Sequence, residues 1–197
     1  MAYEQEHVES CEEVLRLAEA GAILLAVPAF CFIEPMDELR RKRDKHRQLS
    51  DGLRQEFRER QRVRVFAQAQ EQAWAEVQSS LVTITQEAEQ RVNSIHARLL
   101  RCSEILPTGA QVIAHAATLQ VEESRLHFPD AVVLASVLLS LREASRAGQK
   151  SCLFNSNKQD FETPTIVELL RQQQCTLKVR FDHGLSFIQA ALKGRAG

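Results

Sequence analysis

The sequence is poor in residues that interrupt regular structure. Its 197 residues include 7 glycines and 5 prolines, and the stretch between Met36 and Leu106 has one glycine and no proline. Arginine, glutamine, glutamate and alanine dominate that stretch, so we expect long helices there, with a break at Gly52. Hydrophobic residues are 44% of the chain and charged residues 26%, which excludes general disorder and fits one globular domain.

Long apolar runs and paired cysteines are also absent. No run approaches the roughly 20 residues of a membrane-spanning helix, and residues 1–21 are acidic and amphipathic, unlike a signal peptide. The five cysteines are scattered, without a Cys-x-x-Cys pair. This spacing argues against a disulfide framework or a zinc site and fits a reducing compartment. We therefore expect a cytoplasmic protein that has no membrane partner.

The motifs of several enzyme classes are missing as well. The sequence has no Walker loop, no Gly-x-Gly-x-x-Gly and no Gly-x-Ser-x-Gly, so nucleotide-dependent, dinucleotide-dependent and triad-hydrolase functions lack support. The six histidines are dispersed and include no His-Glu-x-x-His, so we assign them no metal role.

The hydrophobic pattern alternates between helical and strand-like segments. We expect helices over 8–20, 164–173 and 185–192 and through the apolar segment after Asp130, and strands over 22–28, 151–154 and 175–181. Thr108 is the expected N-cap of a further helix. Strands that alternate with helices predict an α/β fold whose parallel sheet carries helices on both faces.

Three acidic residues follow strands or open helices, and they are the candidate catalytic residues. Glu34 comes shortly after the first strand, Asp130 heads the apolar helix, and Asp160 follows the strand "SCLF". Ligands of parallel α/β sheets bind beyond the carboxyl ends of the strands. Carboxylates gathered there repel one another unless a cation joins them, and oxygen ligands suit Mg²⁺ or Mn²⁺.

Each of these acids also has a purely structural interpretation. Asp130 could be only a helix N-cap, which is a favoured place for aspartate. Glu34 could be a surface residue at a helix start, where the helix dipole favours a negative charge. Asp160 could be a turn residue, because "NSNKQD" is rich in turn formers.

Three segments together are similar to the motifs of PIN-domain nucleases. "VPAFCFIEPMDEL", "FPDAVVLASVLL" and "CLFNSNKQDF" occur in the order of those motifs and at about their positions. The chain resembles a larger PIN-like domain over about residues 8–190, with a helical elaboration at about 36–106. The resemblance implies a single domain over 1–197, an α/β fold with a PIN-like parallel-sheet sandwich, helices on both faces and a long helical insertion.

The resemblance also implies a single-strand-specific ribonuclease that uses Mg²⁺ or Mn²⁺. By motif, Glu34 and Asp130 would be metal ligands, and Asp160 or Asn157 would complete the site directly or through water. Asn155 would orient a ligand or a water without touching the metal itself.

The chain departs from the family pattern in three ways. It has no Asp-bearing strand before its first helix; in the family that strand lies at the centre of the sheet, and its neighbours would otherwise keep unpaired backbone groups. Pro35 follows Glu34, and a residue before proline avoids helical geometry, which makes Glu38 the next candidate. Asn157 stands where many relatives have Asp, which should lower the metal affinity.

A basic segment follows Glu34. Between Arg40 and Arg64 there are eleven Lys or Arg residues against four Asp or Glu. Beside a metal site, such a stripe would attract a phosphate backbone. Alternatively, it is a solvated helix face with ion pairs within the helix. The candidate RNA-binding residues are Arg40, Arg41, Lys42, Arg43 and Lys45.

The leading hypothesis is therefore a PIN-like metal-dependent ribonuclease. The second hypothesis is a catalytically inactive PIN-like module that binds RNA or a protein, and the missing first acid and Asn157 favour it. A third is a structural α/β protein whose long helical arm forms an oligomer. A protein inhibitor and a further copy of the chain are the other candidate partners.

Overall fold

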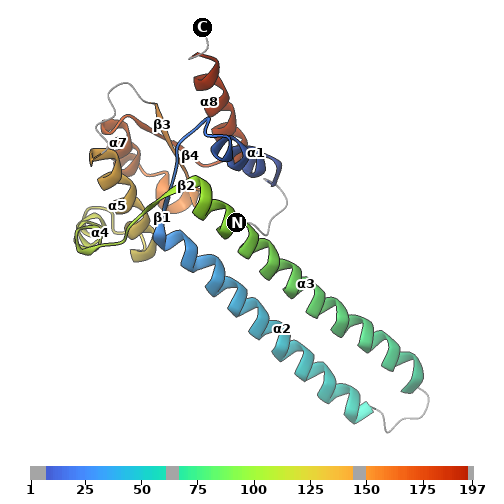
Figure 1. The fold of residues 1–197 in the computed structure, drawn as a ribbon. Helices are drawn as coiled ribbons and strands as arrows, with labels where there is room; N and C mark the ends of the chain where they lie inside the picture. The colour runs from blue at the N-terminus through green and yellow to red at the C-terminus, as the bar shows by residue number, and fades with distance from the viewer. Residues whose placement is uncertain (1–7, 61–66, 144–149, 195–197) are drawn as a thin grey trace. The chain divides into compact units, whose positions relative to one another are not determined.

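The computed structural model describes residues 8–60, 67–143 and 150–194 (Figure 1). The chain falls into two compact units, which we describe separately. The helical unit contains residues 33–96, and the α/β unit contains residues 8–32 and those from 97 onward.

The helical unit consists of α2 (Ile33–Arg60) and of α3 (Ala67–Cys102) up to His96. The two helices run side by side in opposite directions (Figure 1). The ring nitrogen Nδ1 of His46 lies 3.0 Å from the hydroxyl of Thr85, which joins them. The break predicted at Gly52 is wrong, because α2 passes through it. One glycine costs a helix only about 1 kcal/mol, and the residues around it favour helix.

The α/β unit begins with α1 and ends with α8, and the last turns of α3 precede β2. Its elements, in chain order, are α1 (Val8–Glu19), β1 (Leu25–Pro28), the 3₁₀ helix η2 (Ala29–Phe32), β2 (Ser103–Leu106), α4 (Ala110–Glu122), α5 (Phe128–Glu143), β3 (Ser151–Phe154), α6 (Lys158–Phe161), α7 (Pro164–Gln172), β4 (Cys175–Lys178) and α8 (Phe181–Lys193).

The strands form two parallel pairs. β1 pairs with β2, so that Leu25 lies opposite Ser103, and β3 pairs with β4, so that Ser151 lies opposite Cys175. The predicted mixed α/β class with parallel strands is confirmed. In the described part of the chain, the strands make two two-stranded sheets, so the predicted PIN-like sandwich is not shown.

Three predicted element boundaries need correction. Residues 103–106, expected to be helical, form β2, because they pair with β1. The N-cap of α4 is Gly109 rather than Thr108, and it provides no side-chain cap. The last strand ends at Lys178 instead of running to residue 181, because Phe181 already begins α8.

The core of the α/β unit surrounds α5. Ala131, Leu134, Ala135 and Leu138 are each at most 1% exposed, which explains why this helix has almost no polar face. The buried Ser136 donates its hydroxyl hydrogen to the carbonyl of Val132 at 2.8 Å, so its polar atom is satisfied. Among the described residues, no helix has both the length and the apolar character needed to cross a bilayer.

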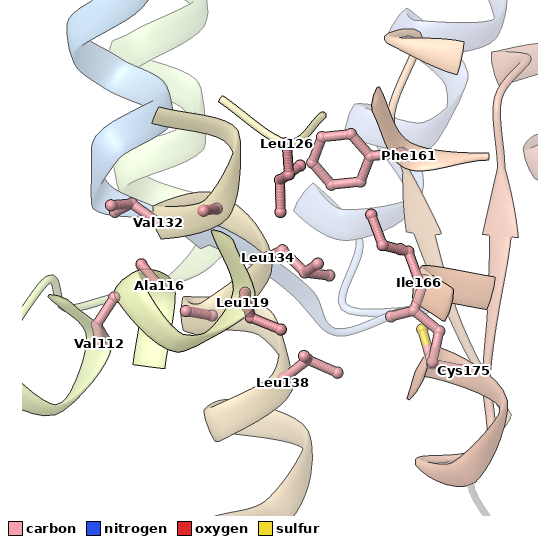
Figure 2. Close-up of a cluster of buried hydrophobic side chains, with 13 residues drawn as sticks. Val112, Ala116, Leu119, Leu126, Val132, Leu134, Leu138, Phe161, Ile166 and Cys175 are labelled. Atoms are coloured by element: carbon pink, nitrogen blue, oxygen red, sulfur yellow. The ribbon is translucent and has the colours of Figure 1, made fainter. Parts of the chain in front are cut away.

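Side chains from α4, α6 and α7 complete this core. Figure 2 shows Phe161 of α6 beside Leu126, and Ile166 of α7 near Cys175 of β4. Phe161 is fully buried, although α6 has only four residues. A short helix anchored in this way holds the polar residues next to Phe161 in a fixed position.

Candidate functional site

Two of the predicted acids meet in the α/β unit. Asp130 lies in the first turn of α5, and Asp160 lies in α6. The side-chain nitrogen Nδ2 of Asn157 donates to Oδ2 of Asp160 at 2.7 Å and to Oδ2 of Asp130 at 3.3 Å. The structure therefore brings together Asp130, Asn157 and Asp160, which we call the acid cluster.

The local sequence explains how Asn157 reaches this place. Asn155, which follows β3, is only 8% exposed, and its Oδ1 accepts the backbone N–H of Asn157 at 2.8 Å. The Oδ1 of Asn157 in turn accepts the backbone N–H of Asp160 at 3.4 Å, which caps α6. Asn155 thus holds the turn, and Asn157 links the turn to both carboxylates.

Asp130 is not the N-cap of its helix. α5 begins at Phe128, two residues earlier, so the carboxylate lies within the first turn. A negative charge is favoured there by the free backbone N–H groups of the helix start. The structural interpretation of Asp130 as an N-cap is therefore wrong, although a favourable interaction with the helix dipole remains.

The oxygen atoms of the acid cluster suit a divalent cation, but the side-chain amide of Asn157 is not oriented to bind one. Carboxylate and amide oxygens are the ligands that Mg²⁺ and Mn²⁺ prefer. Asn157, however, turns N–H groups toward the carboxylates, and its oxygen faces the backbone of α6. In the described residues, no group of three or more His, Cys, Asp or Glu residues is placed to hold a metal ion.

Glu34 belongs to the helical unit, where it lies exposed in the first turn of α2. The proline that follows it is also in this turn, where proline is tolerated because no N–H is needed. Glu34 therefore has helical geometry, contrary to the expectation for a residue before proline. Its participation in the acid cluster stays a prediction. Glu38, the other candidate, bonds to Arg41 at 2.8 Å.

Four of the five predicted RNA-binding residues form ion pairs within the helical unit. Arg40 pairs with Asp37 at 3.1 Å, and Arg43 pairs with Glu89 of α3 at 3.7 Å. Arg41 and Lys42 both pair with Glu38, and Lys45 is exposed. These pairs are solvent-exposed and weak, so they leave RNA contact by the basic segment as a prediction.

The sequence interpretation missed the basic residues at the end of β4. It placed Arg180 inside a strand, whereas Lys178 ends β4 and Arg180 is the N-cap of α8. The available signal was Asp182, because an aspartate in this position favours a helix start.

Known proteins do not identify the chain. Comparison with protein-family models, with curated proteins and with solved structures gives no match. The function therefore has to be argued from the acid cluster and its surroundings.

Proposed function

We propose that the chain is a PIN-like, metal-dependent ribonuclease that hydrolyses phosphodiester bonds in single-stranded RNA. The convergence of Asp130 and Asp160 on one point carries the proposal. Two segments separated by 30 residues of sequence supply these carboxylates, and each has an oxygen within 3.3 Å of the same amide nitrogen. Two carboxylates that approach the same amide nitrogen repel each other, so they need a positive partner or hydrogen-bond donors.

A Mg²⁺ or Mn²⁺ ion at this place would supply Lewis acidity and an activated water. Asp130 and Asp160 would hold it through their carboxylate oxygens. Asn157 could add Oδ1 after its side-chain amide rotates. Asn155 would keep Asn157 in position through its bond to the backbone N–H.

The proposal also includes how the two strand pairs and the long helices fit a PIN-like fold. We propose that β1–β2 and β3–β4 are two parts of one PIN-like sheet, with α2 and α3 as the helical elaboration. Both pairs are parallel, and all-parallel sheets occur mainly in α/β proteins whose helices cover both faces of the sheet. None of the five cysteines, all of which the structure describes, forms a disulfide, which is in keeping with a cytoplasmic protein.

A second candidate function, an inactive PIN-like module that binds RNA or protein, is favoured by one observation. The Asn157 amide already donates to both carboxylates, so they have a partner without a cation. In that case the acid cluster would be a structural link between α5 and α6.

The test is cleavage of a 5′-labelled single-stranded RNA in the presence of Mn²⁺. We would compare the wild type with Asp130→Asn and Asp160→Asn, and use Asp51→Asn on the exposed surface of α2 as the matched control. The proposal predicts cleavage that EDTA stops, that either acid-cluster variant lowers at least 100-fold, and that the control retains.

Two outcomes would contradict it. Equal cleavage by all variants would show that the activity comes from elsewhere or from a contaminant. Absence of cleavage, together with no Mn²⁺-dependent rise in melting temperature, would favour the inactive module. All three substitutions keep the size of the side chain, so a folding defect should be small and can be checked by circular dichroism.

A further inference from the structure

The edge of the β3–β4 sheet at which the strands end carries both the acid cluster and two cations. β3 leads into Asn155 and Asn157, and β4 ends at Lys178, two residues before Arg180. The strands are parallel, so their carboxyl ends share one edge. The backbone N–H of Asn155 donates to the carbonyl of Lys178 at 3.2 Å, which ties the two strand ends together.

Lys178 lies on the face of the sheet opposite to the core. Phe154 and Lys178 are register partners, so their side chains point to the same face. That face is covered by α8, since Phe154 stacks on Phe181 with ring centres 5.4 Å apart. The preceding pair, Leu153 and Leu177, packs against the core. Lys178 and the acid cluster therefore lie on either side of one sheet edge.

Both cations are held in place by neighbours on α8. The Nζ of Lys178 lies over the ring of Phe187, 5.1 Å from its centre, which is a cation–π geometry. Arg180 forms two hydrogen bonds to the carboxylate of Asp182, at 2.8 and 3.0 Å. These bonds hold the pKa of Asp182 well below its usual range. Residues 178–182 contain two cations and one carboxylate, so the segment keeps a formal positive charge.

A ribonuclease built on carboxylates needs such a segment, because the acids repel a polyanion. Lysine and arginine next to them would hold the phosphates that flank the reacting one, without reading the bases. Arg180 could exchange Asp182 for a phosphate, since a guanidinium forms the same forked bond to either group. The basic residues of α2 are a less direct choice, because they belong to the other unit.

We propose that the β4–α8 junction, residues 178–182, binds the phosphate backbone of single-stranded RNA beside the acid cluster. This inference rests on the proposed function for its substrate. Lys178 and Arg180 are the contact residues. Phe154, Phe181 and Phe187 position them by fixing α8 on the sheet. Asp182 competes with phosphate for Arg180 and so limits the affinity.

The experiment measures binding rather than cleavage. Fluorescence polarisation of a labelled oligouridylate and a labelled oligocytidylate is recorded in EDTA over a series of salt concentrations. The variants are Lys178→Gln, Arg180→Gln and Asp182→Asn. Lys193→Gln, an exposed lysine near the end of α8, is the matched control. Lys178→Arg and Arg180→Lys keep the charge and test whether a loss comes from misfolding.

We expect each Gln variant to weaken binding of both RNAs by about 3- to 10-fold and to lower the slope of log K against log salt by about 0.7, the value for one lost contact to a single strand. Asp182→Asn should tighten binding, while Lys193→Gln should change nothing. The charge-keeping variants should bind nearly as well as the wild type.

Absence of RNA binding by the wild type would overturn the inference, and so would unchanged affinity and slope in both Gln variants. Its failure can be told apart from failure of the proposed ribonuclease. Binding that depends on Lys178 and Arg180 but without cleavage would support the junction and refute the enzyme. Cleavage with an unchanged KM in both Gln variants would support the ribonuclease and refute RNA binding at the junction.

Discussion

Gly184→Ala should destabilise the α/β unit, although alanine favours helices. Gly184 is buried in α8, and a Cβ placed there would overlap Cε1 of Phe154 and lie within 2.6 Å of two more ring atoms. No side chain can be accepted at such distances without moving the ring. Phe154 would have to leave its stacked position on Phe181.

The expected magnitude follows from two opposing effects. Replacing glycine by alanine in a helix gains about 1 kcal/mol. Overpacking costs about 1–3 kcal/mol, and the lost ring stacking costs a further 0.5–1.5 kcal/mol or so. We therefore expect a net loss of about 0.5–3.5 kcal/mol in the free energy of unfolding. Gly52→Ala in α2 is the matched control, because no atom lies within 4 Å of its built Cβ, and it should stabilise by up to about 1 kcal/mol.

Urea unfolding followed by circular dichroism measures both changes, and amide hydrogen exchange in β3 and α8 shows where Gly184→Ala acts. A second test uses Phe154→Ala, which removes the ring that the new methyl group would meet. In that background, Gly184→Ala should become neutral or stabilising, because the two substitutions are coupled through one contact. If Gly184→Ala costs the same with and without the ring, the reasoning is refuted.

Three further predictions concern the core, the acid cluster and pH. Phe161→Ala should lower the free energy of unfolding by about 3–5 kcal/mol, because the ring is fully buried; a loss below 1 kcal/mol in urea unfolding would contradict the packing. Asn157→Asp should lower the melting temperature in EDTA through repulsion among three carboxylates and raise it in Mn²⁺ by more than in the wild type; an equal response in both media would argue against a cation site. Hydrogen bonds from Arg98 lower the pKa of Glu12 and Glu19. These bonds therefore stabilise the fold fully above the ordinary pKa of glutamate. The stabilisation is lost as the pH falls through the lower pKa values of the folded state. Urea midpoints of Arg98→Gln and wild type should therefore differ at pH 7 and approach each other near pH 3. A difference between the midpoints that is independent of pH would show that the bonds of Arg98 do not stabilise the fold electrostatically.

The sequence was sufficient to predict the buried helix α5 and the strand β3. The segment after Asp130 has apolar residues on all sides, which is typical of a buried helix, and most of these residues in α5 are buried or partly buried. "SCLF" is a short apolar run between polar residues, and it forms β3. The structure of these segments follows from their local composition, so it can be predicted from a single sequence.

Features that depend on distant partners could not be predicted in this way. Residues 103–106 continue a long helical sequence, and only pairing with β1, far earlier in the chain, makes them a strand. The end of the last strand is a similar case. Phenylalanine is common in strands, yet Phe181 begins α8 and stacks on Phe154. A tertiary contact decides the boundary in both cases.

The acid cluster combines both kinds of information. Its members could be predicted from their places after a strand and at helix starts, and the structure brings Asp130 and Asp160 to the same amide. The role of that amide could not be predicted, because either end of the Asn157 side chain can face a carboxylate. Its oxygen caps α6 through the backbone of Asp160, so it cannot turn toward a cation without giving up the cap. Cation binding at this site therefore competes with a hydrogen bond that fixes α6. An aspartate at position 157 would remove that competition, since one of its oxygens could cap the helix while the other binds the ion.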